Sequence, residues 1–146
     1  MHTAMKNAGG WKESEMRTWL NDDVYNNMSN KDYIKSVTKM TNNTGYQGTV
    51  VTATTDSVFL LSPKETGITN DTNNSRWNEY PEEYKQVLEA EGMAYAWFES
   101  NTVNFWFWLR SPDSGGGDDF FRYDCGSLMD IDANSENTVC PAFVIG

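Results

Sequence analysis

The chain has 146 residues, and its 21 Asp and Glu residues against 11 Lys and Arg residues give a formal net charge of −10. This length predicts one domain, residues 1–146, and the acidic charge argues against nucleic acid as a partner because phosphate groups are repelled. No apolar run approaches the roughly 20 residues of a membrane-spanning helix, and the first residues lack the apolar stretch of a signal peptide, so no membrane insertion is expected. Hydrophobic residues make up 38% of the chain and aromatic residues 14%, which predicts a core built on large rings.

The first predicted element is an amphipathic helix from about Ser14 to Asn27. Serine is a residue type that caps helix N-termini, and several turn-favouring Asn residues end the pattern. The helical period comes from apolar side chains that recur at every fourth position and therefore line one face: Met16, Leu20, Val24 and Met28.

The middle of the chain predicts shorter elements. A helical turn is followed by a strand at Val37–Thr41, and the β-branched segment Thr49–Thr55 is either a strand or an extended loop. The apolar run Asp56–Pro63 predicts a buried strand that ends at the proline. A second helix begins near Pro81, where acidic residues favour the first turn, and ends at Gly92.

The last third predicts a β-meander with long loops. Strands are expected at Phe105–Pro112, Phe120–Tyr123, Leu128–Asp132 and Val139–Ile145, with a glycine-rich loop at Asp113–Asp119 after the first of them. Helices that precede antiparallel strands in this order indicate an α+β domain.

Cysteine and histidine are too few for several kinds of active site. The chain has one histidine, His2, at an end that we expect to be frayed, and two cysteines, Cys125 and Cys140. A Cys/His zinc site needs about four ligands, and a catalytic triad would have to use the terminal histidine. The spacing favours two free thiols but leaves a disulfide open, because it does not show the distance between the two Cα atoms.

Acidic residues gather in the last third: Asp113, Asp118, Asp119, Asp124, Asp130 and Asp132. Carboxylates suit calcium, but no EF-hand spacing is present, and we favour solvated loops and expect no cofactor. The aromatic run Phe105–Trp108 suits either a sugar-stacking platform or the core, because alternate side chains of a strand face opposite ways. The three glycines Gly115–Gly117 lack the pattern of a phosphate-binding loop and favour a flexible loop tip.

One compositional feature distinguishes residues 104–135, which contain no Lys, Glu or Gln. These three types are common elsewhere, and surface loops usually accept them. The segment holds Asp, Gly, Ser, Cys, Phe, Tyr, Leu and Ile instead, all of which arise from an AAY asparagine codon when only its adenines change. Lys, Glu and Gln do not arise in this way, and neither do Met129 and Glu136.

Discontinuous motifs over nearly the whole chain resemble one family of bacterial and phage domains. The opening GGWKESEMRTWLN at Gly9–Asn21 and the strand DSVFLLS at Asp56–Ser62 are similar to its N-terminal and central parts. The pieces WLRSP at Trp108–Pro112 and VCPAFVI at Val139–Ile145, with Phe121-Arg122, Gly126 and Ala133 between them, look like its C-terminal signature. This family comprises the variable proteins of diversity-generating retroelements.

The resemblance implies a C-type-lectin-like fold, with two helices packed on a small twisted antiparallel sheet and long C-terminal loops. In such systems a reverse transcriptase copies a template with errors at adenines, and the copy replaces the C-terminal coding segment, here about residues 104–137. The fixed scaffold would be Trp108, Leu109, Arg110, Ser111, Pro112, Phe121, Arg122, Gly126, Ala133, Pro141 and Phe143. The variable, ligand-binding positions would include Phe105, Asp113, Gly115, Gly116, Gly117, Asp118, Asp119, Phe120, Tyr123, Cys125, Ser127, Leu128, Asp130 and Asp132.

The resemblance therefore implies a binding protein and not an enzyme, with a protein or glycan as its ligand, and it favours a virion or cell surface as the location of the protein itself. Thr138-Val139 departs from the Gly-Val that often precedes the Cys-Pro step, and an N-terminal strand is either absent or supplied by Met1–Lys6. The alternative is a bacterial or phage surface lectin or adhesin of fixed specificity. A weaker alternative is an enzyme of the formylglycine-generating kind, which shares the fold but needs a redox cysteine pair.

Overall fold

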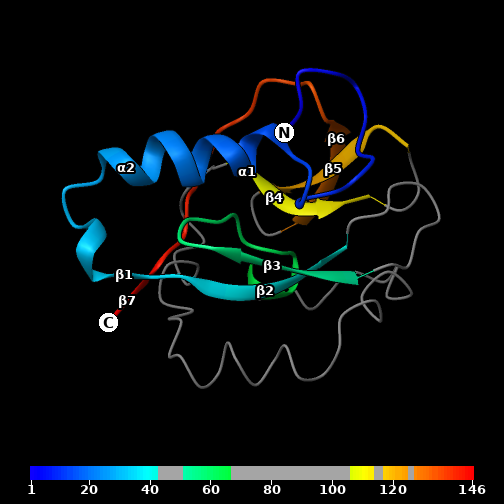
Figure 1. Cartoon of the computed structure of the whole chain (residues 1–146). Helices are drawn as coiled ribbons and strands as arrows, with labels where there is room; N and C mark the ends of the chain where they lie inside the picture. The colour runs from blue at the N-terminus through cyan, green and yellow to red at the C-terminus, as the bar shows by residue number, and fades with distance from the viewer. Residues whose placement is uncertain (43–50, 67–105, 114–116, 125–126) are drawn as a thin grey trace.

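The computed structural model of the protein describes residues 1–42, 51–66, 106–113, 117–124 and 127–146 (Figure 1). Helices lie toward the N-terminal end, and the strands pair antiparallel in small sheets, so the predicted α+β class is confirmed. The second predicted helix, from Pro81 to Gly92, lies outside the described residues.

A continuous helical stretch from Glu15 to Asn27 confirms the first predicted helix. It consists of α1 (Glu15–Trp19), a wider π-helical turn η1 (Leu20–Val24) and α2 (Tyr25–Asn27). Ser14 caps it, because its Oγ accepts a hydrogen bond from the backbone N–H of Arg17 at 3.1 Å. The predicted apolar side chains face the core: Leu20 is fully buried, and Met16, Val24 and Met28 pack at the border.

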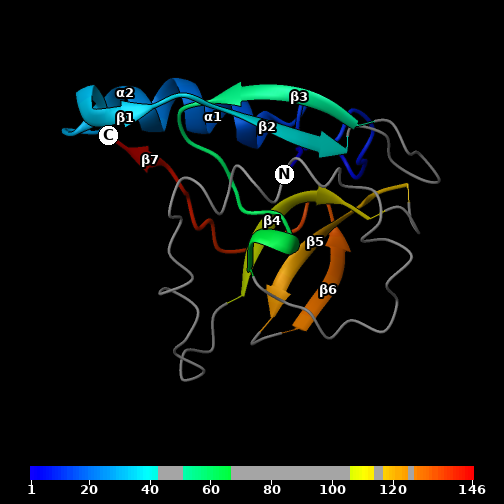
Figure 2. The same cartoon turned by 90° about the horizontal axis from the view of Figure 1, so that it is seen from below.

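A β-hairpin lies beside this helix (Figures 1 and 2). After a 3-10 turn, η2 (Lys31–Tyr33), the chain forms β1 (Ile34–Lys35), which was not predicted, and then β2 (Val37–Asn42), which was. β2 pairs with β3 (Val51–Asp56), so the segment left open between strand and loop is a strand. β1 pairs instead with β7 (Val144–Ile145), at the other end of the sequence.

The apolar run after β3 is buried, but the prediction of a regular strand there is wrong. Phe59 exchanges two backbone hydrogen bonds with Ala142, of 2.9 and 2.8 Å, and this pair forms an isolated β-bridge and not part of a continuous strand. The carbonyls of Leu60 and Leu61 accept hydrogen bonds from Arg110 instead, from its side chain at 2.8 Å and its backbone at 3.0 Å. Because such varied partners satisfy the backbone, the segment is an irregular path through the core, and it ends at η3 (Lys64–Thr66).

The C-terminal part forms the predicted β-meander, with strand order β4-β5-β6 (Figure 2). The three strands are β4 (Trp106–Pro112), β5 (Asp119–Asp124) and β6 (Ser127–Asp132). β4 departs from the alternation expected for a half-buried strand, because Phe107 and Trp108 are both buried and only Trp106 is exposed. Both faces of β4 are therefore covered beyond its first residue.

The core joins the helix, the irregular segment and β4 in one cluster of buried side chains, which includes Trp11, Leu20, Phe59, Trp108 and Phe120. The C-terminal signature contributes less than expected. Phe143, expected in the scaffold core, is only half-buried, and Pro141 is exposed. Only the end of the predicted strand Val139–Ile145 forms a regular strand, β7. Ala142 pairs with Phe59 of the irregular segment, and the chain then crosses to pair with β1.

Candidate functional site

The register of the β4-β5-β6 sheet sorts the predicted ligand-binding residues by face. Residues directly opposite one another in an antiparallel pair share a face, and Asp119 lies opposite Asp132, Phe121 opposite Asp130, and Tyr123 opposite Leu128. These residues form what we call the acidic face of the sheet: Asp119, Phe121, Tyr123, Leu128, Asp130 and Asp132. Five of these six were predicted to bind ligand, and Phe121 was predicted to be fixed.

The acidic face is accessible along part of its length. Asp130 and Asp132 are exposed, whereas Asp119, Tyr123 and Leu128 are half-buried. The ring of Tyr123 stacks on Phe107, with 4.8 Å between the ring centroids and 15° between the planes. The strands thus present carboxylates at one end of the face and a supported aromatic ring at the other.

Two of the predicted contact residues are inaccessible, and their prediction as ligand contacts is wrong for this structure. Phe120 is 0% exposed, because strand alternation turns it to the opposite face, where its ring lies 5.8 Å from that of His2. Asp113 is buried where β4 meets β5, and its backbone N–H donates to the carbonyl of Asp119 at 3.0 Å. Ser127 is exposed, but it pairs with Asp124 and so lies on the face opposite the acidic one.

Two of the remaining predicted positions lie in the described part of the loop before β5. Gly117 is exposed and Asp118 is half-buried, next to the acidic face. Four others lie outside the described residues: Phe105, Gly115, Gly116 and Cys125.

Like charges set the electrostatics of the acidic face. Two groups of carboxylates each have oxygens within 4.8 Å of one another, Asp113-Asp119-Asp130 and Asp118-Asp119-Asp132. Partial burial, the neighbouring Asp118 charge, a hydrogen bond with Asp132 and the charges of Asp130 and Asp132 raise the pKa of Asp119 to about 6. These oxygens are of the type that binds calcium, but solvated carboxylates, which the sequence favours, remain our prediction.

An N-terminal strap, residues 1–10, fixes the base of the loop before β5. The side-chain amide of Asn7 donates to the carbonyls of Asp113 at 3.0 Å and Asp119 at 2.9 Å. The backbone N–H of Asn7 donates to the carbonyl of Gly117 at 3.1 Å. Nothing in the sequence singles out Asn7, since a lone asparagine in a polar segment carries no pattern.

The strap also corrects the expectation of a frayed start. The backbone N–H of His2 donates to the carbonyl of Ala133 at 3.0 Å, and its side chain is buried against Phe120. Burial, as the largest cause, lowers the pKa of His2. Met1–Lys6 does not form the strand that was considered, but it adds backbone contacts beside β6.

Much of the predicted scaffold is buried. Trp108, Leu109, Arg110, Ser111, Pro112 and Ala133 are all buried, whereas Phe121 and Arg122 are half-buried, and Gly126 lies outside the described residues. Arg110 forms a bidentate ion pair with Glu65 of η3, whose carboxylate lies 3.6 Å from the ammonium of Lys39 on β2. The Lys39 ammonium also lies 4.6 Å from the ring centre of Phe59. This ionic cluster cross-links three elements, and the sequence reasoning missed it.

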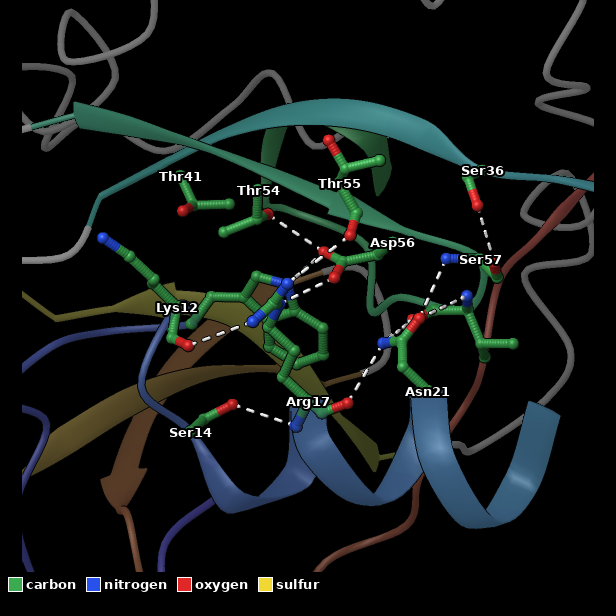
Figure 3. Close-up of polar contacts among 12 residues, drawn as sticks. Lys12, Ser14, Arg17, Asn21, Ser36, Thr41, Thr54, Thr55, Asp56 and Ser57 are labelled. Atoms are coloured by element: carbon green, nitrogen blue, oxygen red, sulfur yellow. Dashed lines mark hydrogen bonds and ion pairs between the residues drawn. The ribbon is translucent and has the colours of Figure 1, made fainter. Parts of the chain in front are cut away.

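A second buried polar cluster joins two of the motifs that carry the family resemblance. The Asp56 carboxylate accepts hydrogen bonds from the indole N–H of Trp11 and the hydroxyl of Thr54, both at 2.9 Å. It also pairs with Arg17, whose Nε lies 2.6 Å from its Oδ1 (Figure 3). The side-chain amide of Asn21, one helical turn after Arg17, donates to the carbonyl of Val58 and accepts hydrogen bonds from the backbone N–H groups of Ser57 and Val58. The opening motif and the central segment are therefore held together through polar side chains.

The one thiol that the structure describes gives little support to redox chemistry. Cys140 is a free, half-buried cysteine, and burial raises the pKa of its thiol, which opposes formation of the reactive thiolate. Cys125 lies outside the described residues.

Comparison with known proteins places the chain in a family. A family model described as "Domain of unknown function (DUF6273)" matches residues 1–146. The chain belongs to the DUF6273 family. The comparisons with curated proteins and with solved structures find no match. Among the described residues of this family member, no helix is long and apolar enough to span a membrane.

Proposed function

We propose that this DUF6273 protein is a ligand-binding protein that displays a variable surface on a C-type-lectin-like scaffold. The variable positions are diversified by adenine-directed retroelement mutagenesis, and the ligand is a receptor or another host-surface molecule recognised from a virion or cell surface. The proposal is of binding and not of catalysis.

One observation carries the proposal: five predicted variable residues share one face of a single sheet, while the predicted fixed residues of the neighbouring strand β4 are buried. The five are those of the acidic face other than Phe121, and they come from β5 and β6. The exposed members of the face, Asp130 and Asp132, contribute little to core packing, so exchange there usually costs within about 0.5 kcal/mol. Tyr123 and Leu128 pack against the core cluster, so exchange at these two positions should cost more. The buried WLRSP residues of β4 give the same sheet a rigid edge.

The missing Lys, Glu and Gln in residues 104–135 support the same reading. Burial of Phe120 removes it from the set of contact residues. The adenine rule could not show this, because it tells which residues can arise at a position and not which way the side chain points. The C-type-lectin-like fold is part of the proposal, and the α+β class with small antiparallel sheets is compatible with it.

The chemistry of the acidic face favours a basic or polyhydroxylated ligand. Asp130 and Asp132 offer exposed carboxylates, which accept hydrogen bonds from ammonium, guanidinium or hydroxyl groups. The Tyr123 ring adds apolar contact area at a low cost in side-chain entropy, as tyrosine does in antibody binding sites.

Sequencing of the flanking DNA tests the diversification. We expect a reverse transcriptase gene and a near-copy of the segment for residues 104–137. The copy should carry adenines where the gene differs, including the codons of Asp119, Tyr123 and Leu128. A locus with neither a reverse transcriptase nor a near-copy would contradict the proposal.

Stability measurements test the separation of face and scaffold. Asp130→Tyr and Asp132→Ser, both accessible from an adenine-rich codon, should each change the free energy of unfolding by less than about 0.5 kcal/mol. Phe120→Ala, on the neighbouring strand β5, is the control, and its loss of buried volume should cost about 3–5 kcal/mol. If the two acidic-face variants unfold as readily as the control, the face is part of the core and the proposal fails.

A surface lectin of fixed specificity is the second candidate, favoured by the half-exposed indole of Trp106 on the other face of the sheet. A glycan array with and without calcium tests this candidate, and the flanking DNA separates it from the first one. An enzyme of the formylglycine-generating kind is the weaker alternative, and thiol-dependent oxidation of a peptide cysteine would reveal it.

A further inference from the structure

The face of the β4-β5-β6 sheet opposite the acidic one carries a second exposed cluster. Trp106 lies opposite Asp124, and Arg122 lies opposite Met129, so these side chains share a face by register. We call these four residues the tryptophan platform. None of Trp106, Arg122 and Met129 was predicted to vary, because Arg122 belongs to the scaffold motif and the Trp and Met codons do not end in a pyrimidine.

The side chains of the platform contact one another. The Arg122 guanidinium carbon lies 5.4 Å from the centre of the Trp106 ring, in the range of a cation–π contact. The same guanidinium donates to the Asp124 carboxylate at 3.2 Å and to the Met129 sulfur at 3.7 Å. Arg122 therefore holds the other three side chains in a fixed arrangement.

The apolar parts of this arrangement remain open to solvent. Trp106 is 53% exposed and Met129 is 45% exposed, whereas the Arg122 and Asp124 side chains are 20% and 21% exposed. Trp106 is also absent from the core cluster, in contrast to its neighbours Phe107 and Trp108. The indole is thus positioned by its neighbours without being needed to fill the core.

Charge narrows the class of ligand. The Arg122 and Asp124 charges offset one another, and a chain with a net charge of −10 repels anions. The pair still offers fixed N–H donors and carboxylate acceptors beside a flat aromatic surface. A ligand that matches is uncharged, has an apolar flat face and carries hydroxyl groups around its edge.

We propose that the tryptophan platform binds the pyranose ring of a neutral saccharide. The C–H groups on one face of the sugar stack on the indole, whose face is electron-rich. Hydroxyl groups at the ring edge donate to the Asp124 carboxylate and accept from the Arg122 guanidinium. The site needs no metal ion, and its Trp106, Arg122 and Met129 stay constant while the acidic face varies.

A second copy of the chain is a poorer occupant. The two copies would repel each other, because both carry the same negative charge. A stable interface buries about 800 Å² on each partner, which is more than the two exposed apolar residues of the platform, Trp106 and Met129, supply. Self-association is therefore an outcome of the test that would contradict the proposal.

The test titrates the full chain with lactose, cellobiose, maltose and N,N′-diacetylchitobiose, with EDTA present, and follows tryptophan fluorescence and NMR saturation transfer. We expect binding of at least one of these sugars. Trp106→Ala should weaken it by about tenfold or more. The matched control is Trp19→Ala, since Trp19 is 44% exposed on α1, far from the platform in the sequence, and this variant should bind as the unmodified protein does.

Three results would overturn the proposal. The first is that none of the four sugars binds, and the second is that Trp106→Ala and Trp19→Ala lose binding equally. The third is that sedimentation shows an oligomer that Trp106→Ala dissociates. Failure here is distinguishable from failure of the variable-surface proposal, because the flanking DNA and the unfolding of Asp130→Tyr and Asp132→Ser test that proposal without any sugar.

Discussion

Asp56 with its hydrogen-bonding partners, which we call the Asp56 cluster, differs from the acidic face in the groups that surround its carboxylate. Asp56 is enclosed and receives hydrogen bonds from Trp11, Thr54 and Arg17, so its charge is matched by donors from three parts of the chain. Asp119 is half-buried among other carboxylates, and its partial burial, followed by the charges of these neighbours, raises its pKa. The first arrangement stabilises the fold, and the second leaves electrostatic repulsion that a cationic or hydrogen-bond-donating ligand would relieve.

The largest effect is expected from the core that both regions share. Trp108→Ala removes a fully buried indole next to the ionic pair of Arg110, and the cavity should reduce the free energy of unfolding by about 3–5 kcal/mol. Phe143→Ala, at a half-buried position of the C-terminal signature, should cost clearly less. Urea denaturation measures both, and equal losses would show that the signature, and not β4 alone, anchors the core.

Asp56→Ala should follow in size. It leaves the buried indole N–H of Trp11 without its acceptor and removes the ion partner of Arg17, with an expected loss of about 3 kcal/mol. Asp22→Ala, an exposed acid on the same helical stretch, is the control and should be nearly neutral. A small loss for Asp56→Ala in urea denaturation would show that the cluster does not hold the two motifs together.

The acidic face should respond to pH in the opposite sense to a stabilising carboxylate. The pKa of Asp119 is about 6 in the folded protein against 3.8 ordinarily, so between these values the folded state binds more protons than the unfolded state. Its contribution to stability is therefore greatest below about pH 4 and is lost as the pH rises through about 6.

Asp119→Asn should abolish this loss, so that the variant has a higher Tm than the unmodified protein at pH 7 and a similar Tm near pH 4. Asp32→Asn, an exposed acid remote from the sheet in sequence, should not change the slope between these pH values. A variant that is less stable at pH 7 would show that the Asp119 charge is stabilised in the fold.

The sequence predicted elements well where one physical pattern dominates. Met16, Leu20, Val24 and Met28 repeat at the helical period, and the helix lies where they place it. The β-meander was likewise predicted from runs separated by Gly and Asp. The segment after Asp56 was mispredicted as a strand, because apolar composition reports burial and not which backbone groups will pair.

The candidate site was predicted less completely, because its arrangement depends on contacts between residues that lie far apart in the sequence. The codon rule grouped Phe120 with Tyr123, yet the pleat turns them to opposite faces. Neither the junction of Trp11 with Asp56 nor the cluster of Lys39 with Glu65 leaves a local pattern. The sequence named most of the residues of the acidic face, but the register was needed to separate them from the tryptophan platform.

The N-terminal strap has a consequence for how the loop before β5 can evolve. The hydrogen bonds that it donates to the last third of the chain end on main-chain oxygens, those of Asp113, Gly117, Asp119 and Ala133. Main-chain carbonyls are the same whatever side chain a codon specifies. Wholesale replacement of the residues in this stretch would therefore leave its anchorage intact, so that new sequences inherit a loop base already held in place.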